Sequence, residues 1–430
     1  MKTIIGKTGT VIIFIITIIP VFLWLPTAVF LNPTSAFRSL GQVSALIGTV
    51  LFCLNFILAA RWKVIEQLFF GLNREYIVHH LVGALGFILL VLHPVFLIIS
   101  YIMISLESAL NLVTPSSANI AVTLGGVALM MLIILLIITF YLRLEYDTWK
   151  KTHQLLGIPL FIASIHAYSV GSTLAQLPVL KAYMGVLFFV GIFAYVYRII
   201  VRQSNMTKYR YIVEAVDRRQ SVTHITMTPV EQHMKFTPGQ FAFIEPHHVG
   251  VPNESHPFTM ISAPGDTNLS FAVKSMGGFT ETVKLLEKGT DVMVEGPYGR
   301  FGYRFVRNTK QIWVSGGIGI TPFVSMLKSL PEDGKYSIVF IYSVRDEQDG
   351  GVLDSLIHEA GPNANVTLVK WVSSEKGRLS AENILQYVPD MQKRDIFLCG
   401  PPVMMSSIKQ QLRASGISAR HIHSEEFSLN

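Results

Sequence analysis

The sequence is short of charged residues and of cysteine. Charged side chains make up 15% of the 430 residues, whereas a soluble domain usually has about 25%. The two cysteines, Cys53 and Cys399, lie in segments of opposite polarity, and the CxxC spacing of zinc sites does not occur. These shortages exclude a purely soluble protein and a disulfide-stapled scaffold.

Positive charge is unevenly divided along the chain. The net charge is +7, and residues 1–206 hold 12 lysines and arginines against 5 acidic residues, whereas residues 207–430 hold 23 of each. A protein that binds nucleic acid carries its excess positive charge on a face of its soluble part. Here the excess lies in the hydrophobic part, so it indicates membrane topology and argues against a nucleic-acid partner.

Six apolar stretches occur in the first half, and most are near the roughly 20 residues that cross a bilayer. They are residues 9–31, 39–60, 77–103, 119–142, 153–171 and 182–201. Lysines and arginines follow the second, fourth and sixth stretches, while the alternate loops hold only Arg38 and Lys181. The positive-inside rule therefore predicts a multi-pass cell-membrane protein with both termini and the whole second half in the cytoplasm.

The first stretch has one feature of a signal peptide, because Lys2 and Lys7 precede it. Its apolar run is longer than the usual run of about 7–15 residues, and no A-x-A cleavage site follows it. We therefore expect this stretch to remain in the protein as a span.

Five histidines lie in or at the edge of the third and fifth stretches, where ionisable groups are costly and are candidates for function. They are His79, His80, His93, His153 and His166. Aligning the pattern H-x-L-[VL]-G in the two stretches gives spacings of 14 residues to His93 and 13 residues to His166. The alignment predicts that His79 faces His153 nearer the cytoplasm and that His93 faces His166 nearer the exterior. Each pair is then placed to ligate one haem from both sides.

Each histidine taken alone is also explained as a hydrogen-bonded structural residue, and His80 competes with His79 for the same role. No CxxCH motif occurs, so covalent haem attachment is excluded and the predicted groups are two b-type haems. The 14-residue spacing puts His79 and His93 on one helix face. The 13-residue spacing does not do so for the other pair, for which a kink at Pro159 is one remedy.

Arginines near the ends of the spans are candidate partners for haem propionates. Arg38 lies at the outer start of the second stretch, and Arg61 and Arg74 lie on the inner side. Ordinary topology charge explains Arg61 and Arg74 equally well.

The second half of the chain has a different texture. Short alternating runs broken by proline and glycine begin near residue 207; examples are Tyr209–Val216, Val222–Thr228, Phe241–Ile244 and Leu269–Val273. They predict the antiparallel strands of a small barrel over residues 207–306. Strands then alternate with helices, which predicts a parallel sheet in a domain of residues 307–430. With a helical membrane domain of residues 1–206, the chain has three predicted domains.

Four short motifs stand at the ends of these elements. They are His256-Pro257-Phe258-Thr259, Gly277-Gly278-Phe279-Thr280, Gly316-Gly317-Ile318-Gly319-Ile320-Thr321-Pro322 and Cys399-Gly400-Pro401. Two of them are glycine-rich turns that open a helix, where free backbone N–H groups and the helix dipole bind phosphate. The last one ends a strand, and ligands of open α/β sheets bind beyond the carboxyl ends of strands.

In this order, the motifs and the paired histidines resemble the NADPH oxidase and ferric reductase family of membrane flavocytochromes. The resemblance covers nearly the whole chain and implies a six-helix haem domain followed by a ferredoxin-NADP reductase-like module. It implies that Thr259 meets the flavin ring of FAD and that His256 and Phe258 contact FAD. It also implies that Gly278 and Thr280 hold the FAD pyrophosphate.

The same resemblance assigns the nicotinamide dinucleotide to the second glycine-rich turn. It places Thr321 and the Cys399-Gly400-Pro401 turn near the nicotinamide. The candidate catalytic residues are Thr321, Cys399 and Phe427. The family often ends in an aromatic residue stacked on the flavin. Phe427 is the candidate for this role, although Ser428, Leu429 and Asn430 follow it.

The choice of nucleotide depends on Ser343, Arg345 and Arg378, which by resemblance surround the 2′-phosphate. No acidic residue stands at the strand end before Arg345, although Asp346 follows it, and an arginine there suits the extra phosphate. We therefore expect NADPH as the electron donor, with NADH as the alternative. A solvated loop arginine is the other explanation of Arg345.

The resemblance implies an enzyme that takes electrons from cytoplasmic NADPH through FAD and two haems to an extracellular acceptor. The His-Pro-Phe-Thr motif and the His79/His93 spacing favour O2, reduced to superoxide, although Leu97 stands where superoxide-producing members can carry another histidine. An Fe(III) chelate is the alternative acceptor. Two other classes remain: a haem subunit or sensor that serves a partner protein, and a transporter with structural histidines. The oligomeric state is left open.

Overall fold

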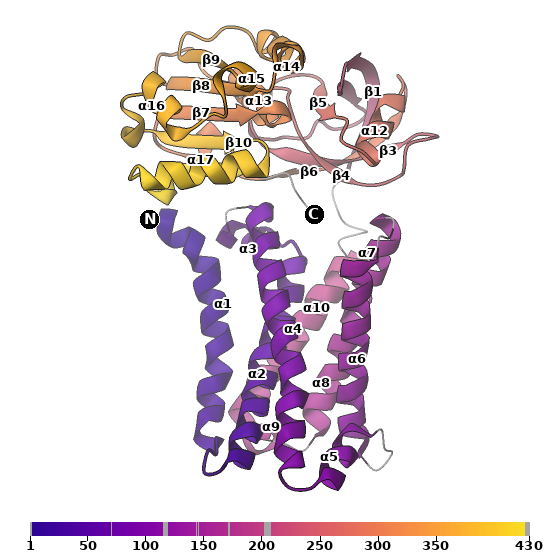
Figure 1. Ribbon diagram of the computed structural model, residues 1–430. Coiled ribbons are helices and arrows are strands. Elements are labelled where there is room, and N and C mark those ends of the chain that lie inside the picture. Colours follow the sequence, from indigo (N-terminus) through magenta and orange to yellow (C-terminus); the bar gives the residue numbers. More distant parts are fainter. Residues whose placement is uncertain are drawn as a thin grey trace. The chain divides into compact units, whose positions relative to one another are not determined.

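The computed structural model describes residues 2–69, 71–114, 119–142, 144, 146–170, 173–201 and 208–425. The chain divides into two compact units, Met1–Asn205 and Met206–Asn430 (Figure 1). The first unit is helical, and the second contains two β-sheets with flanking helices.

The apolar stretches of the first unit form helices. Those of the described residues are α1 (Lys2–Trp24), α2 (Pro33–Ala59), α3 (Lys63–Phe69), α4 (Leu72–Ile102), α5 (Leu106–Val113), α6 (Ile120–Tyr141), α7 (Tyr146–Gln154), α8 (Gly157–Ser169), α9 (Thr173–Gln176) and α10 (Pro178–Val196). The start of α2 shows why they begin where they do: the Asn32 side chain accepts a hydrogen bond from the Ser35 N–H, and Pro33 occupies the first turn. Within the described residues, five segments are long and apolar enough to cross a membrane. They are Thr8–Thr27, Pro33–Ala59, Arg74–Ile102, Ile120–Tyr141 and Pro178–Ile200.

The fifth predicted stretch, residues 153–171, is not one helix. α7 ends at Gln154, α8 begins at Gly157, and the turn between them is tightened by a hydrogen bond from the Leu155 N–H to Thr152 O. α8 has 13 residues, which rise only about 20 Å, whereas a hydrocarbon core is about 30 Å thick. In the described part of the chain, the structure therefore gives five helices of spanning length instead of the six predicted stretches.

The break between α7 and α8 also explains how histidines 13 residues apart can serve one face. His153 lies at the end of α7 and His166 lies in α8, so two separate helices set the directions of their side chains. Pro159 is the third residue of α8, where a missing N–H leaves no intrahelical hydrogen bond unmade. The break in the helix thus precedes Pro159.

Glycines bring α2 close to α4, one of the helices that it packs against. A Cβ atom on Gly41 would lie 2.9 Å from Leu97 Cδ2, and one on Gly48 would lie 3.0 Å from Leu90 Cγ. Small residues let helix backbones approach in a membrane, where packing replaces the hydrophobic effect as the driving force. The close approach puts main-chain carbonyls of α2 within reach of side chains on α4.

The first sheet of the second unit is antiparallel. Its strands are β1 (Lys208–Arg219), β2 (Val222–Pro229), β3 (Phe241–His247), β4 (His256–Thr259), β5 (Leu269–Lys274) and β6 (Asp291–Tyr298). Their order is β4-β3-β6-β1-β2-β5, and a bridge from Met260, directly after β4, to Phe271 in β5 joins the two ends into a barrel. Inward side chains such as Tyr211, Val213 and Ile225 fill its core. The predicted antiparallel barrel is confirmed.

The second sheet is parallel, as the alternation of strands and helices predicts. Its strands are β7 (Lys310–Gly316), β8 (Ser337–Val344), β9 (Val366–Val372), β10 (Asp395–Cys399) and β11 (Ile422–Glu425), in the order β11-β10-β7-β8-β9. The helices that accompany it are α13 (Thr321–Lys328), α14 (Glu347–Ala360), α15 (Ser373–Lys376), α16 (Ala381–Tyr387) and α17 (Pro402–Ala414).

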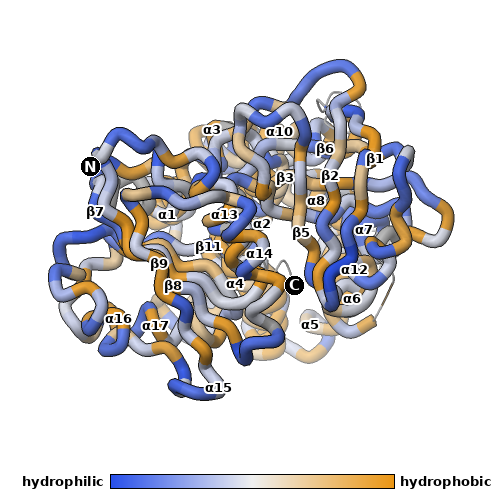
Figure 2. The backbone as a smooth tube through the Cα atoms, turned by 90° about the horizontal axis from the view of Figure 1, so that it is seen from above, coloured by the Kyte–Doolittle hydropathy of each residue, from blue (hydrophilic) through white to orange (hydrophobic). Residues whose placement is uncertain are grey.

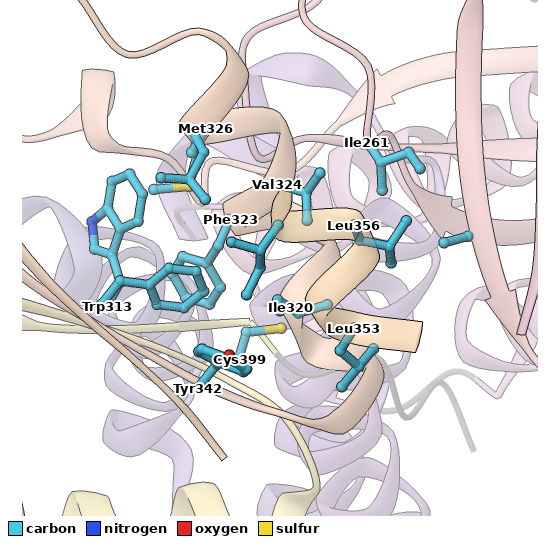
Figure 3. Packing of buried hydrophobic residues seen from close by; sticks show 14 of the residues in the cluster. Ile261, Trp313, Ile320, Phe323, Val324, Met326, Tyr342, Leu353, Leu356 and Cys399 are labelled. Carbon is cyan, nitrogen blue, oxygen red and sulfur yellow. The ribbon is translucent and has the colours of Figure 1, made fainter. Parts of the chain in front are cut away.

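A hydrophobic cluster covers each face of this sheet. One joins Trp313 of β7 to Phe323 of α13 and Leu353 of α14 (Figure 3). The other joins the neighbouring Ile312 to Met405 of α17, because successive side chains of a strand point to opposite faces. In Figure 2 the hydrophobic colour follows β8 and β9 and gives way to the hydrophilic colour at the turn that carries α15. The strands are thus apolar on both faces, and their ends carry the polar residues.

Candidate functional site

Four of the histidines singled out in the sequence come together as two pairs in the first unit. His79 and His93 are in α4, His153 is in α7 and His166 is in α8. The ring centres of His79 and His153 are 6.5 Å apart. His93 and His166 are also near neighbours. These are the two pairs that the sequence alignment predicts.

His80 is the alternative to His79 in the first pair. Its side chain is exposed, and its ring centre lies 5.8 Å from that of His79. The His79 ring is half-buried and faces His153. The geometry therefore favours His79 as the partner of His153.

Three of the four imidazoles contact a main-chain carbonyl of a neighbouring helix through Nδ1. The contacts are His79 Nδ1 to Asn55 O at 3.2 Å, His93 Nδ1 to Gly41 O at 2.8 Å and His166 Nδ1 to Ala121 O at 2.6 Å. A carbonyl oxygen only accepts, so each Nδ1 carries the proton and each Nε2 keeps its lone pair. Metal-bound histidines are oriented in this way, through the ring nitrogen that does not bind the metal.

The paired imidazoles fit haem iron. Two imidazoles that bind one metal ion from opposite sides, each at a distance of about 2 Å, have ring centres about 6 Å apart, and 6.5 Å separates the rings of His79 and His153. Across the residues that the structure describes, no three His, Cys, Asp or Glu side chains gather as a metal site. Donors that come in pairs suit a haem, because the porphyrin supplies the remaining ligands.

Gly125 of α6 makes room for the His166 ring. A Cβ atom on Gly125 would lie 2.6 Å from Cε1 and 2.9 Å from Nε2 of His166, whereas one on Gly126 would meet nothing within 4 Å. The ring is also held by its bond to Ala121 O. Any side chain at position 125 would therefore displace the imidazole.

Two of the three arginines predicted beside haem propionates, Arg38 and Arg74, are exposed. Arg38 lies one turn before Gly41 in α2, and the Gly41 carbonyl holds His93. Arg74 lies in the first turn of α4, five residues before His79. Arg38 is therefore near the contact that holds His93, and Arg74 is near His79 on the same helix.

Arg61 is connected to the first pair through an aromatic ring. Its Nε donates to the Tyr76 hydroxyl at 2.5 Å, and its guanidinium lies 5.3 Å from the centre of the Tyr76 ring. The Tyr76 ring meets His79 edge to face, with 6.5 Å between the centres. Arg61 therefore contacts a residue that packs against His79. A role limited to setting membrane topology would not require such a contact.

The motif predicted to bind FAD forms strand β4, which pairs with β3. The His256 Nε2 donates to a carboxylate oxygen of Glu254 at 2.8 Å, and its ring stacks on Phe279 with 4.0 Å between the centres. Phe258 also stacks on Phe279, at 6.2 Å. Phe279 itself is buried in the barrel core, and Thr259 is also buried. Phe279 thus holds His256 and Phe258 in place by stacking against both rings.

The glycine-rich turn before α12 (Phe279–Thr282) needs its glycines. Gly277 and Gly278 have φ values of +102° and +51°, a region that favours glycine. The Thr280 hydroxyl closes the turn by donating to Gly277 O at 2.8 Å and accepting from the Met276 N–H at 2.9 Å. Both glycines are exposed, so the turn offers backbone N–H groups without side chains in front of them.

A cavity of about 460 Å³ lies at the carboxyl ends of the parallel strands. The predicted nucleotide-binding residues that line it are Gly316, Gly317, Ser343, Arg345, Arg378 and Pro401. They come from the ends of β7 and β8 and from the segments that follow β9 and β10. Ligands of open α/β sheets bind at this edge, and the volume suits a small molecule.

Other residues predicted near the nicotinamide are buried beside the cavity. The Thr321 hydroxyl donates to Ile318 O at 3.1 Å, and a Cβ atom on Gly319 would lie 2.5 Å from Cys399 O. The Cys399 side chain belongs to the hydrophobic cluster of Figure 3. Burial raises the pKa of the Cys399 thiol well above its usual value, and the charge of Glu425 adds to this effect. Cys399 is thus a neutral thiol whose main chain meets the glycine-rich turn.

Several groups around the cavity were not found from the sequence. Lys274, at the end of β5, and Ser221, between β1 and β2, bring residues of the barrel to its wall. Ser373, Met404 and Ser407 line it from the parallel-sheet side. The available signal for Lys274 was a cation three residues before the glycine-rich turn at Gly277.

Glu425, at the end of β11, is another residue that the sequence reasoning missed. Its side chain is 5% exposed, and β11 pairs it with Cys399. A Cβ atom on Gly299, after β6, would lie 2.9 Å from Glu425 Oε1. A buried carboxylate therefore stands where an end of the barrel meets an end of the parallel sheet. Phe427, the predicted aromatic residue at the flavin, lies outside the described residues.

Family models match three consecutive parts of the chain. Residues 44–165 match a ferric reductase like transmembrane component, residues 206–301 an FAD-binding domain and residues 313–410 an oxidoreductase NAD-binding domain. The first range contains His79, His93 and His153 and ends one residue before His166. The second contains both motifs predicted for FAD, and the third contains most of the residues that line the cavity.

Among curated proteins, the chain is 28% identical over 206 residues to the toluate 1,2-dioxygenase electron transfer component of Pseudomonas putida. It is 30% identical over 207 residues to the glycine betaine monooxygenase reductase subunit of Pseudomonas aeruginosa. The alignments cover 46% and 45% of this chain, and 60% and 56% of the two relatives. The chain thus spans less than two thirds of the length of these curated relatives.

Among solved structures, flavohemoglobin from Malassezia yamatoensis matches 96% of this chain and 99% of its own, with a TM-score of 0.52 and 14% identity. The ferredoxin reductase in carbazole 1,9a-dioxygenase matches 52% of this chain and 70% of its own, with a TM-score of 0.45 and 19% identity. At 14% identity, the first likeness is one of fold.

Proposed function

By its three consecutive domains the chain belongs to the ferric reductase and NADPH oxidase family of oxidoreductases, and on that premise we propose that it moves electrons from NADPH, through FAD and two b-type haems, to an extracellular acceptor. The observation that carries the proposal is the pairing of four imidazoles, three of which have Nδ1 bonded to a carbonyl and Nε2 left to bind a metal. α4, which holds His79 and His93, is long and apolar enough to cross a membrane, and this supports metal centres inside the bilayer.

The membrane unit holds the two haems. His79 and His153 ligate one iron and His93 and His166 the other, each through Nε2. Arg38 neutralises propionates at the His93 end, and Arg74 or Arg61 does so at the His79 end. The distribution of lysine and arginine puts the His79 end on the cytoplasmic side, together with the reductase unit.

The barrel binds FAD. Thr259 faces the flavin ring, His256 and Phe258 contact the cofactor, and the N–H groups of the Gly277-Gly278 turn bind its pyrophosphate. When bound, FAD accepts a hydride from the nicotinamide and releases electrons singly to haem iron. Phe427 is the candidate for the aromatic residue that would stack on the flavin.

The parallel sheet binds the nucleotide in its cavity. Gly316 and Gly317 receive the pyrophosphate, while Ser343, Arg345 and Arg378 surround the 2′-phosphate, with Lys274 as a further cation. The turns at Gly319 and Gly400 form the surface that contacts the nicotinamide. This surface lies next to the buried Thr321 and Cys399. Hydride transfer needs no general base, so these residues act by position and by excluding water.

An optical spectrum tests the proposal. Protein purified after haem-replete expression is expected to contain two haems and one FAD per chain, to show the α band of b-type haem when reduced, and to oxidise NADPH alone. A colourless protein would overturn the proposal in favour of a transporter or a tethered reductase. NADPH oxidation only after addition of another protein would instead support the haem subunit or sensor.

The acceptor is proposed to be O2, reduced to superoxide at the His93/His166 haem. A ferric chelate is the second candidate, favoured by the match of residues 44–165 to a ferric reductase like transmembrane component. NADPH-driven reduction of cytochrome c that superoxide dismutase abolishes supports O2. Reduction of an Fe(III) chelate that continues without O2 and is insensitive to this enzyme supports the second candidate.

Replacing Arg345 by alanine is expected to weaken the binding of NADPH and to spare NADH. Arg345 lines the cavity and also pairs with Asp346, with 3.4 Å between Nε and Oδ2. A charge-assisted hydrogen bond contributes about 1.5–3 kcal/mol, so the KM for NADPH should rise about 10- to 100-fold. Steady-state kinetics with both nucleotides and a soluble dye as acceptor measure the effect.

Arg413→Ala is the matched control, because Arg413 is exposed in the last turn of α17 and does not line the cavity. It should leave both KM values unchanged. An equal loss of NADPH and NADH activity in Arg345→Ala would mean that Arg345 does not read the 2′-phosphate, and the preference for NADPH would then be withdrawn.

A further inference from the structure

We propose that Thr139 and Trp149 are positioning residues for His153, which fix its ring plane and its Nδ1 proton and so set the affinity and reduction potential of the His79/His153 haem. This inference rests on the proposed function, because it concerns a haem that the two imidazoles would share. The residues come from different helices: Thr139 is in α6, and Trp149 and His153 are in α7.

Trp149 and His153 stand one helical turn apart, which puts their side chains on the same face of α7. The two rings are stacked, with 5.1 Å between the centres and 10° between the planes. The indole Nε1 donates to Thr139 O at 3.2 Å, so the indole is anchored to α6. A rotation of the His153 ring would therefore have to push against an aromatic plane that is itself held in place.

Thr139 defines which nitrogen of His153 carries the proton. Its hydroxyl donates to Leu135 O at 2.7 Å and lies 3.5 Å from His153 Nδ1. Because the hydroxyl proton is committed to Leu135 O, the hydroxyl oxygen accepts from His153 Nδ1–H. His153 Nε2 then keeps its lone pair and would be the nitrogen that binds the metal.

His153 is held differently from the other three imidazoles. Their Nδ1 atoms contact main-chain carbonyls at 2.6 to 3.2 Å, which no substitution of the carbonyl-bearing residue removes. The acceptor of His153 is a side-chain hydroxyl at a longer distance. The orientation of His153 therefore depends on the side chains of Thr139 and Trp149, and substitution can change both.

The hydrogen bond that an imidazole makes through Nδ1 affects how strongly its Nε2 binds a metal. A hydrogen bond from Nδ1–H makes Nε2 more basic, and the loss of such a bond weakens metal affinity by about 10- to 100-fold. When the ligand becomes less basic, ferric iron loses more stabilisation than ferrous iron does. The midpoint potential of the haem therefore rises. Only the haem that His153 ligates should respond.

The test uses full-length protein and compares Thr139→Val, Thr139→Ser and Trp149→Phe with wild type. Optical redox titration resolves the two haems, and the haem-to-flavin ratio reports their retention. Thr139→Val should raise the potential of one haem, leave the other unmoved and weaken haem retention about tenfold. Thr139→Ser keeps the acceptor and should restore the wild-type titration. Trp149→Phe removes the indole N–H and should shift the same component in the same direction by less.

Thr17→Val is the control for Thr139→Val, because the Thr17 hydroxyl makes the same kind of bond, to Ile13 O at 2.7 Å, and contacts no histidine that is named here. Two unmoved potentials and a full haem complement in Thr139→Val, or in Trp149→Phe if the valine variant does not accumulate, would overturn the inference. A wild-type protein without any haem band would instead overturn the proposed function, so the two failures are distinct.

Discussion

Replacing His166 by alanine is expected to remove one haem and to stop electron transfer to the extracellular acceptor, while NADPH still reduces the flavin. His166 is the imidazole whose Nδ1 makes the shortest of the three carbonyl bonds, to Ala121 O at 2.6 Å. Without it, His93 alone cannot hold the iron from both sides. The haem-to-flavin ratio should fall from two to one, and acceptor reduction should fall to background.

Gly125→Ala tests the same ligand without changing it. The added Cβ would lie within 3 Å of three atoms of the His166 ring, which is fixed by its hydrogen bond. The ring must move, so partial loss of one haem and slower acceptor reduction are expected, between wild type and His166→Ala. The adjacent Gly126→Ala is the matched control, because its Cβ would meet nothing within 4 Å.

His80→Ala is the second control, since His80 is exposed and stands beside a proposed ligand. It should retain both haems. Two haems in His166→Ala would contradict the assignment of this ligand. Loss of a haem in His80→Ala would mean that His80, not His79, pairs with His153.

The strands and turns of the second unit could be predicted because their signals are local. Alternating side chains mark β1 and β2, and the glycines of the turn at Gly277 and Gly278 are required by positive φ values. The turn that begins at Gly316 likewise follows directly from an apolar strand and opens a helix. Such features depend on the nearest residues, so the sequence alone contains them.

The break between α7 and α8 could not be predicted, because the residues at it, Leu155 and Leu156, are apolar and continue the pattern of a span. The helix-breaking residues in this part of the sequence, Gly157 and Pro159, both lie inside the first turn of α8. What ends α7 is the turn at Leu155, together with tertiary contacts such as that of Trp149 with Thr139 O. An apolar pattern predicts burial in lipid, but it does not say where a helix stops.

The partners of the site residues were missed for a related reason. Thr139 and His153 are 14 residues apart on different helices, and Glu425 reaches Cys399 only because β10 and β11 are neighbours in the sheet. Ligand-type residues can be found by their rarity in an apolar sequence. The residues that orient them are common types, and only the fold makes them special.

Gly319→Ala is expected to lower kcat/KM for NADPH about 100-fold, since a displacement of about 1 Å near reacting groups can cost this much. A Cβ atom there would lie 2.5 Å from Cys399 O and 2.7 Å from the Gly400 Cα. Both are backbone atoms at the end of a buried strand, so they cannot move aside as a flexible side chain could. The turn after β7 and the turn after β10 would separate. The surface on which the nicotinamide is proposed to bind would then be disrupted.

FAD content separates this effect from general unfolding, because the FAD motifs lie in the barrel and not in these turns. Gly351→Ala is the matched control: Gly351 lies in α14, and its Cβ would meet nothing within 4 Å. Alanine there should leave kinetics unchanged and add up to about 1 kcal/mol of stability, because glycine is a poor helix former. Wild-type kinetics in Gly319→Ala, measured with NADPH and a soluble dye, would show that the contact between the two turns does not position the nicotinamide.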